Sequence, residues 1–162
     1  MGNFISDKRR GEIGEQIVAN ILKASYPKGD IVKSKGRINW DFAVDEGRTE
    51  NSTLYFEVKY DEMARDTGNI CFEVSNGAKL TGIFASETNF VFYIIPTKTA
   101  NTYEVFKMDR LKLVKWLNES PELTRAVNGG DKKKFSLLLV KKEVLLSAIE
   151  KLGTYLTWVE KE

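Results

Sequence analysis

Histidine is absent from all 162 residues of this chain, and that absence excludes several kinds of chemistry. Ser-His-Asp and Cys-His catalysis, HNH-type sites and His-ligated zinc all need an imidazole. Acid–base or metal chemistry must therefore use carboxylates, lysines, tyrosines or water. Sites built from oxygen ligands suit magnesium, manganese or calcium better than zinc or copper.

Cysteine and long apolar runs are also scarce. Cys71 is the only cysteine, so the sequence excludes an internal disulfide and a four-cysteine zinc site. No apolar run approaches the roughly 18 residues that span a bilayer, and the N-terminal segment lacks the apolar stretch of a signal peptide. The sequence therefore predicts a protein of a reducing cytoplasm with no membrane partner.

The order of the expected elements predicts a mixed α/β protein. Helical spacing of apolar residues indicates a helix over residues 6–24. Apolar alternation or continuous apolar runs predict strands over 30–34, 38–45, 53–60, 69–75, 90–95, 102–108 and 135–140. Helices are expected over 109–117, where Asp109 is the N-cap, and over 141–152. A short helix or ordered loop is expected over 78–86 and a loop over 118–134. No repeat or linker divides residues 1–162, so we expect one domain.

Gly14 lies in the middle of the first helix's apolar stripe. Glycine there costs roughly 1 kcal/mol of helix stability against alanine. A close approach of the helix to a neighbouring sheet explains why a glycine occupies this position.

Glu57-Val58-Lys59 carries the first chemical signal. In the strand over 53–60, Leu54, Phe56 and Val58 share one face, so Glu57 and Lys59 leave the other face together. Strand charges that face water are common, and this motif alone does not define a site.

Asp41 strengthens the signal, because its strand is expected to pair with the strand of Glu57. Trp40, Phe42 and Val44 are expected on one face and Asp41 on the other. Two carboxylates this close repel, and each raises the other's pKa unless a cation lies between them. Independent surface acids remain the alternative at this point.

Glu15 adds a third acid from the margin of the first helix's buried stripe. Glu12, one turn earlier, points further into solvent. Glutamate is also a favoured surface residue of helices, so Glu15 gains meaning only from the rest of the pattern.

Gly11-Glu12-Ile13-Gly14-Glu15, Asp41 and Glu57-Val58-Lys59, in this order, resemble the PD-(D/E)xK phosphodiesterase superfamily. The resemblance spans about residues 8–96 and implies a restriction-endonuclease-like αβββαβ core, a central mixed sheet flanked by helices. Residues 102–162 would then form a C-terminal α/β extension. Segments 68–74 and 77–83 are similar to small phage-type nucleases, and archaeal-type and phage Holliday-junction resolvases are the nearest kind. Trp40 stands where the family name places proline.

The resemblance implies Mg²⁺-dependent hydrolysis of DNA, with Mn²⁺ able to substitute. Asp41, Glu57 and the backbone carbonyl of Val58 would be metal ligands, and Glu15 would hold or orient water at the metal. Lys59 would contact the scissile phosphate or the attacking water. Acting as a cation, Lys59 needs no pKa shift, so charge stabilisation is favoured over a role as base.

Clustered basic residues are expected to flank this site, although the net charge is only +2. Any one cluster alone is typical of a solvated surface. The expected DNA-binding residues are Lys8, Arg9, Arg10, Lys33, Lys35, Arg37 and Lys79. Lys132–Lys134 and Lys141–Lys142 are further basic groups. Glu73 is interpreted as a surface strand charge, with a role as an extra ligand as the alternative.

The leading hypothesis is a DNA endonuclease, most specifically a branched-DNA or Holliday-junction resolvase of a bacterial or archaeal cell, phage-encoded forms included. That form predicts a homodimer, because two cuts across a junction need two sites. The alternatives are a restriction-like or recombination-type nuclease on duplex or single strands, and a DNA-binding module without catalysis. Substrate shape, metal count and the role of the segment after residue 100 stay open.

Overall fold

The computed structural model describes residues 4–35, 39–50, 52–129 and 135–161. The N-terminal elements are α1 (Phe4–Ser25), β1 (Asp30–Lys33), β2 (Phe42–Asp45), β3 (Thr53–Tyr60), α2 (Met63–Thr67), β4 (Asn69–Asn76), β5 (Lys79–Leu80) and the 3-10 turn η1 (Gly82–Phe84). The later elements are β6 (Phe90–Pro96), β7 (Thr102–Asp109), α3 (Arg110–Glu119), the 3-10 turn η2 (Pro121–Leu123), β8 (Thr124–Gly129), β9 (Phe135–Lys141), α4 (Lys142–Ser147), α5 (Ile149–Leu152) and β10 (Gly153–Val159).

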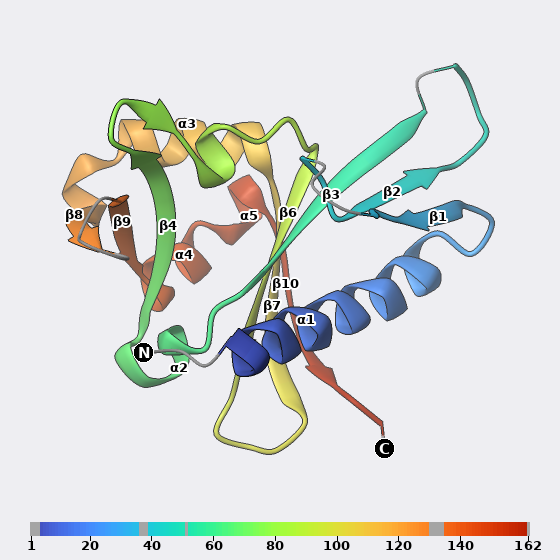
Figure 1. Ribbon diagram of the computed structural model, residues 1–162, viewed down its shortest axis with the longest axis horizontal. Coiled ribbons are helices and arrows are strands. Elements are labelled where there is room, and N and C mark those ends of the chain that lie inside the picture. The colour runs from blue at the N-terminus through green and yellow to red at the C-terminus, as the bar shows by residue number, and fades with distance from the viewer. Residues whose placement is uncertain (1–3, 36–38, 51, 130–134, 162) are drawn as a thin grey trace.

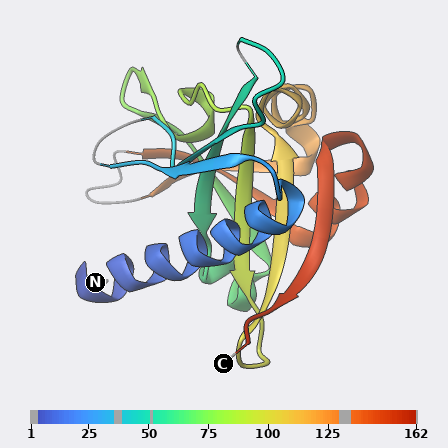
Figure 2. The ribbon, with the colours of Figure 1, turned by 90° about the vertical axis from the view of Figure 1, so that its right-hand side faces the viewer.

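A six-stranded mixed sheet with the order β1-β2-β3-β6-β7-β10 runs through the molecule. Adjacent strands of this sheet are antiparallel, except β3 and β6, which are parallel. Figures 1 and 2 show α1 across one face of this sheet, with β4, β8, β9 and the C-terminal helices on the other side. The second sheet has the order β5-β4-β9-β8. The chain is therefore an α/β protein with a mixed central sheet, as the sequence predicted.

Strand β6 separates two hydrophobic cores, because successive side chains of a strand point to opposite faces. Phe92 and Ile94 are buried under α1 with Phe56. Val91 and Ile95 are buried on the other face, in the core shared with the second sheet and the later helices. This placement confirms the interpretation of the apolar run 90–95 as a buried central strand.

Helix α1 packs on the sheet through its predicted apolar stripe, and Ile17 and Val18 are fully buried there. Gly14 lies against β3, where an added Cβ would be 3.4 Å from Val58 Cγ1 and 3.5 Å from Tyr60 Cβ. Helix and sheet therefore lie close together, as expected, but a methyl group would make only ordinary van der Waals contacts, so this approach does not require glycine. No helix in the described part of the chain is long and apolar enough to cross a membrane.

The later elements join the same sheet. β7 pairs with β6, and β10 pairs with β7, so the expected C-terminal extension supplies two strands of the central sheet. Asp109 caps α3 as predicted, because its side chain accepts a hydrogen bond from the Lys112 amide. The division into a core over 8–96 and an extension over 102–162 stays a prediction.

Some expectations about elements were wrong. β8 lies in the expected loop 118–134, while β10 and the short helix α2 were not expected. β2 begins at Phe42, so Trp40 is outside regular strand structure; Ile38 lies outside the described residues. Trp40 packs on Tyr55, with ring centroids 5.5 Å apart, and not with Phe42 and Val44. Strand alternation therefore gave the wrong face for Trp40.

Candidate active site

Glu57 and Lys59 leave the same face of β3, as their spacing predicted. Lys59 Nζ lies 3.0 Å from Glu57 Oε1. The Glu57 side chain is only 15% exposed, against 41% for Lys59. Glu57 Oε2 is buried and has no hydrogen-bond partner among the described residues. A buried carboxylate oxygen without a partner is costly, so this atom marks a place where a ligand can gain binding energy.

Asp41 lies immediately before β2 and continues its pairing with β3 through both backbone and side chain. Its amide donates to the Phe56 carbonyl oxygen at 2.9 Å, and its Oδ2 accepts from the Val58 amide at 2.7 Å. Burial raises the pKa of the Asp41 carboxyl, and the charges of Glu57 and Glu15 raise it further. The Val58 hydrogen bond and the charge of Lys59 oppose this rise in the pKa.

Asp41, Glu57 and Lys59 line a common hollow of about 260 Å³, together with Glu73 of β4. Three carboxylates and one ammonium group leave two negative charges when all four are ionised. Such an excess attracts a cation, and a divalent ion neutralises it.

Gly82 forms part of the wall beside Glu73. Its φ is +57°, and an added Cβ would lie 2.6 Å from the Glu73 carbonyl oxygen. Glycine therefore lets η1 pass close to β4 at the hollow. The sequence favoured Glu73 as a surface strand charge, with a role as an extra ligand as the alternative. Its place in this hollow agrees with the alternative, and it depends on how the two sheets pack.

Glu15 is not brought into this hollow. It lines a different hollow, of about 330 Å³, with Lys33, and its Oε2 lies 2.8 Å from Lys33 Nζ. Its charge still reaches Asp41. Within the described ranges, no three acidic or cysteine side chains are grouped closely enough to hold one metal ion. The expected three-acid cluster is therefore divided between two hollows that share no lining residue.

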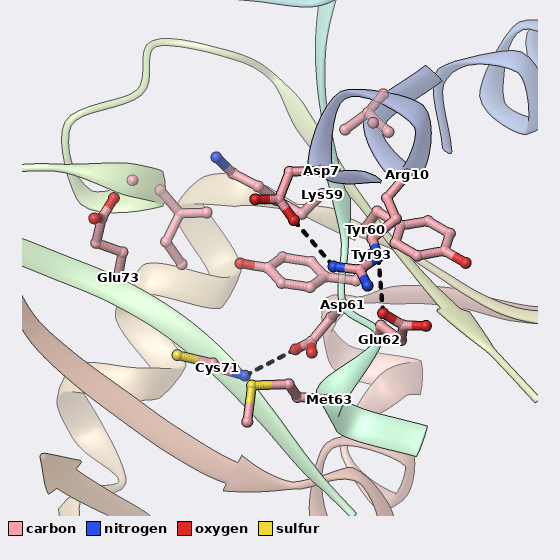
Figure 3. A pocket seen from close by; sticks show the side chains of 14 residues that line it. Asp7, Arg10, Lys59, Tyr60, Asp61, Glu62, Met63, Cys71, Glu73 and Tyr93 are labelled. Atoms are coloured by element: carbon pink, nitrogen blue, oxygen red, sulfur yellow. Dashed lines mark hydrogen bonds and ion pairs between the residues drawn. The ribbon is translucent and has the colours of Figure 1, made fainter. Parts of the chain in front are cut away.

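The expected DNA-binding residues differ in how their charge is compensated. Arg10 is held between Asp7 Oδ1, at 3.0 Å, and Glu62 Oε2, at 2.8 Å, as Figure 3 shows. Lys33 is paired with Glu15. The other described members are exposed and have no ion pair within the described chain: Lys8, Arg9, Lys35 and Lys79. Arg37 and the basic group 132–134 lie outside the described residues.

A larger hollow of about 520 Å³ adjoins the acidic one, and Lys59, Glu73 and Gly82 line both. Asp61 accepts a hydrogen bond there from the Cys71 amide at 3.2 Å, as Figure 3 shows, and another from the Ala64 amide at 3.0 Å. Its carboxylate is thus used to hold the chain between α2 and β4. Burial raises the pKa of the Cys71 thiol to about 11, which leaves it protonated and unreactive near neutral pH.

No family model, curated protein or solved structure matches this chain. The interpretation of the site therefore depends on the sequence and on the geometry of these hollows.

Proposed function

We propose that this chain is a metal-dependent nuclease that hydrolyses phosphodiester bonds in DNA. One observation carries the proposal: Asp41, Glu57, Glu73 and Lys59 line one hollow, where Glu57 Oε2 is buried without a partner among the described residues. Phosphodiester hydrolysis needs a site for a cation and a positive group near the phosphate, and this hollow offers both.

The donor set fits a hard divalent cation. All candidate ligands are oxygens, and Mg²⁺ is bound by one or two carboxylates while it keeps several waters. Asp41 and Glu57 would hold the ion with the backbone carbonyl of Val58. Glu15 would act from the hollow of about 330 Å³ that it lines with Lys33. Mn²⁺ is expected to substitute. When bound, such an ion lowers the pKa of water and polarises a phosphoryl oxygen.

The chain's own residues have separate roles. The Val58 amide fixes the Asp41 carboxylate at 2.7 Å. Lys59 neutralises Glu57 in the free protein and is exposed enough to turn toward a phosphate. Glu15 is oriented by Lys33. Lys59 acts as a cation, because a charged ammonium group can stabilise a phosphate without losing its proton.

The order of elements supports a PD-(D/E)xK-type core as part of the proposal. α1 precedes the antiparallel strands β1, β2 and β3, and β6 then adds to β3 in parallel. The helix between β3 and β6 is only the five-residue α2, which is followed by β4 and β5. That insertion delivers Glu73 to the hollow.

The most specific form of the proposal is a nuclease acting on branched DNA, with a junction resolvase as the extreme case. A resolvase would act as a homodimer, because two cuts across a junction need two sites. Restriction-like or recombination-type cleavage of duplex or single strands is the enzymatic alternative.

One observation favours a non-catalytic DNA-binding module instead. Glu57 and Glu15 already have lysine partners, and no three acidic side chains of the described residues are grouped around one point. Calcium separates the two functions. A metal site binds Ca²⁺ and raises the melting temperature in an Asp41-dependent way, whereas a bare binding module does not respond.

The decisive experiment uses end-labelled four-way junction, flap, duplex and single-stranded DNA in Mg²⁺. Asp41→Asn and Glu57→Gln should lose nearly all cleavage and keep DNA binding, since phosphate contacts come mainly from basic residues. Asp30→Asn is the matched control, because Asp30 is an exposed acid of β1 at the opposite end of the β1–β2 pairing from Lys33. Full cleavage by the folded Asp41→Asn protein would contradict the site assignment.

A further inference from the structure

The acidic hollow shares lining residues with two others, and the three hollows together are called the groove below. At one end it shares Lys59, Glu73 and Gly82 with the hollow of about 520 Å³. At the other end it shares Asn39 and Trp40 with a hollow of about 340 Å³. A polymer lying along the groove would therefore contact the residues at both ends while one of its phosphates lies beside Lys59.

The end near Trp40 has an aromatic wall. Trp40 and Tyr55 line the 340 Å³ hollow, with ring centroids 5.5 Å apart and ring planes at 55°. Both side chains are only half-buried. Because the rings are tilted against each other, a flat ligand stacks on the open face of the pair and not between the two rings.

The aromatic wall has a fixed position relative to the residues of the proposed active site. Tyr55, Glu57 and Lys59 alternate along β3, so the three side chains leave one face at successive two-residue steps. Each step spans roughly 6.6 Å. Trp40 directly precedes Asp41, which is fixed to β3 by the Val58 amide. The aromatic pair is therefore held at a set distance from the carboxylates.

We infer that Trp40 and Tyr55 stack an unpaired base next to the phosphate that is cut, so that the substrate is single-stranded on this side of the scissile bond. Bases inside a duplex have both faces covered by their neighbours, and only an unpaired base can present a face to the indole. Asn39 and Glu87 line the same hollow and supply hydrogen-bonding groups for a base edge. This inference rests on the proposed nuclease function.

The test measures binding of a single-stranded oligonucleotide and of a matched blunt duplex, in an Asp41→Asn background without Mg²⁺. Trp40→Leu keeps an apolar side chain and removes the stacking face. We expect it to weaken single-strand binding about tenfold and to leave duplex binding unchanged. Trp40→Phe should retain part of the single-strand affinity. The control Trp158→Phe should retain all of it, because Trp158 is half-buried against the core under α1 and lines none of the three hollows.

A second measurement follows Trp40 itself. In a variant carrying Trp116→Phe and Trp158→Phe, Trp40 is the remaining tryptophan. Its fluorescence should be quenched by the single strand and not by the duplex. Unchanged single-strand binding by Trp40→Leu, or equal loss for both DNA forms, would overturn the inference.

Failure of the nuclease proposal gives a different result. In one outcome the chain cuts no DNA in Mg²⁺ while Trp40→Leu still weakens binding of single strands and not of duplex. That result would support the stacking inference and contradict the nuclease proposal. If the chain cuts DNA and Trp40→Leu changes neither binding nor substrate preference, the stacking inference alone is overturned.

Discussion

At the scale of single residues, the two oxygens of Glu57 have different surroundings. Oε1 lies 3.0 Å from Lys59 Nζ, whereas Oε2 is buried and has no hydrogen-bond partner in the described part of the chain. Lys59 is thus the cation paired with this carboxylate in the free protein. It is also the cation that the proposed mechanism requires beside the phosphate, and substitutions at Lys59 can separate charge from proton transfer.

Lys59→Arg should keep part of the cleavage activity, whereas Lys59→Met should have none. Arginine remains cationic but does not deprotonate in proteins, so it replaces a charge and not a base. Initial cleavage rates in Mg²⁺ measure the difference, with circular dichroism as the check on folding. Complete inactivity of both folded variants would favour a base mechanism for Lys59.

Tyr60 allows a prediction about alkaline stability. Burial raises its pKa to about 12, and the neighbouring Tyr103 and Glu62 act in the same direction. The unfolded tyrosine ionises near pH 10, so between about pH 10 and 12 the folded state binds more protons. The free energy of unfolding contributed by Tyr60 is therefore present below pH 10 and is lost as the pH rises through this window.

Tyr60→Phe should consequently lose less stability than the original chain over that pH range, while its ring still packs on Tyr103. Urea denaturation at about pH 8 and about pH 11 gives the loss in the free energy of unfolding for each protein, and the two losses are compared. Other tyrosines with raised pKa values remain in both proteins, so only the difference between the proteins is interpreted. Equal losses would show that the Tyr60 hydroxyl does not contribute.

At the scale of elements, two glycines differ in what they allow. An alanine Cβ at Gly14 of α1 would make ordinary contacts with Val58 and Tyr60 of β3. An alanine Cβ at Gly82 would lie 2.6 Å from the Glu73 carbonyl oxygen, in a backbone with φ of +57°. The first position is α-helical and leaves room for a methyl group, whereas the second has a left-handed backbone and no room for one.

Gly14→Ala should therefore be neutral or stabilise the protein by up to about 1 kcal/mol, because alanine favours the helix. Gly82→Ala should destabilise it by about 1–3 kcal/mol, because of the strained backbone and the clash. Thermal melts of both variants test this pair. A more stable Gly82→Ala protein would mean that η1 lies further from β4 than the structure places it.

Elements with strong patterns were predictable from the sequence. The apolar stripe of α1 follows the helical period, and the apolar alternation of β3 follows the two-residue period of a strand. Each pattern therefore predicted both the type of element and its buried face. β8 was missed because half of its residues are exposed, none is buried, and the segment carries little apolar alternation. β10 was missed although Tyr155, Trp158 and Val159 are residue types that favour strands. None of its residues is buried, and its pairing with β7 is a long-range contact that the sequence does not reveal.

At the scale of the whole molecule, the candidate site was predictable where one or two paired strands define it. Glu57 and Lys59 share a face, and Asp41 reaches β3, as expected. Glu15 faces the other hollow, and Glu73 enters from β4, because both positions depend on how α1 and the second sheet pack on the central sheet. Trp40 was placed on the wrong face because strand geometry begins only at Phe42, so the alternation does not extend back to Trp40.

The distribution of compensated and uncompensated cations gives a last prediction. Arg10 is tied to Asp7 and Glu62, whereas Lys8 and Arg9 beside it are exposed and lack an ion pair within the described chain. A cation that is already paired inside the protein gives up that partner when it binds phosphate. Lys8 and Arg9 should therefore contribute more to DNA binding than Arg10.

The double substitution Lys8→Gln/Arg9→Gln should reduce the slope of log affinity against log salt by about 0.7 per lost phosphate contact on single strands. Arg10→Gln should change that slope less. Lys115→Gln/Lys151→Gln is the control, since these exposed lysines belong to α3 and α5 and line none of the hollows of the groove. Fluorescence anisotropy at several salt concentrations measures all three. An unchanged slope for Lys8→Gln/Arg9→Gln would move the DNA path away from the N-terminal end of α1, because released counterions report which cations meet phosphates.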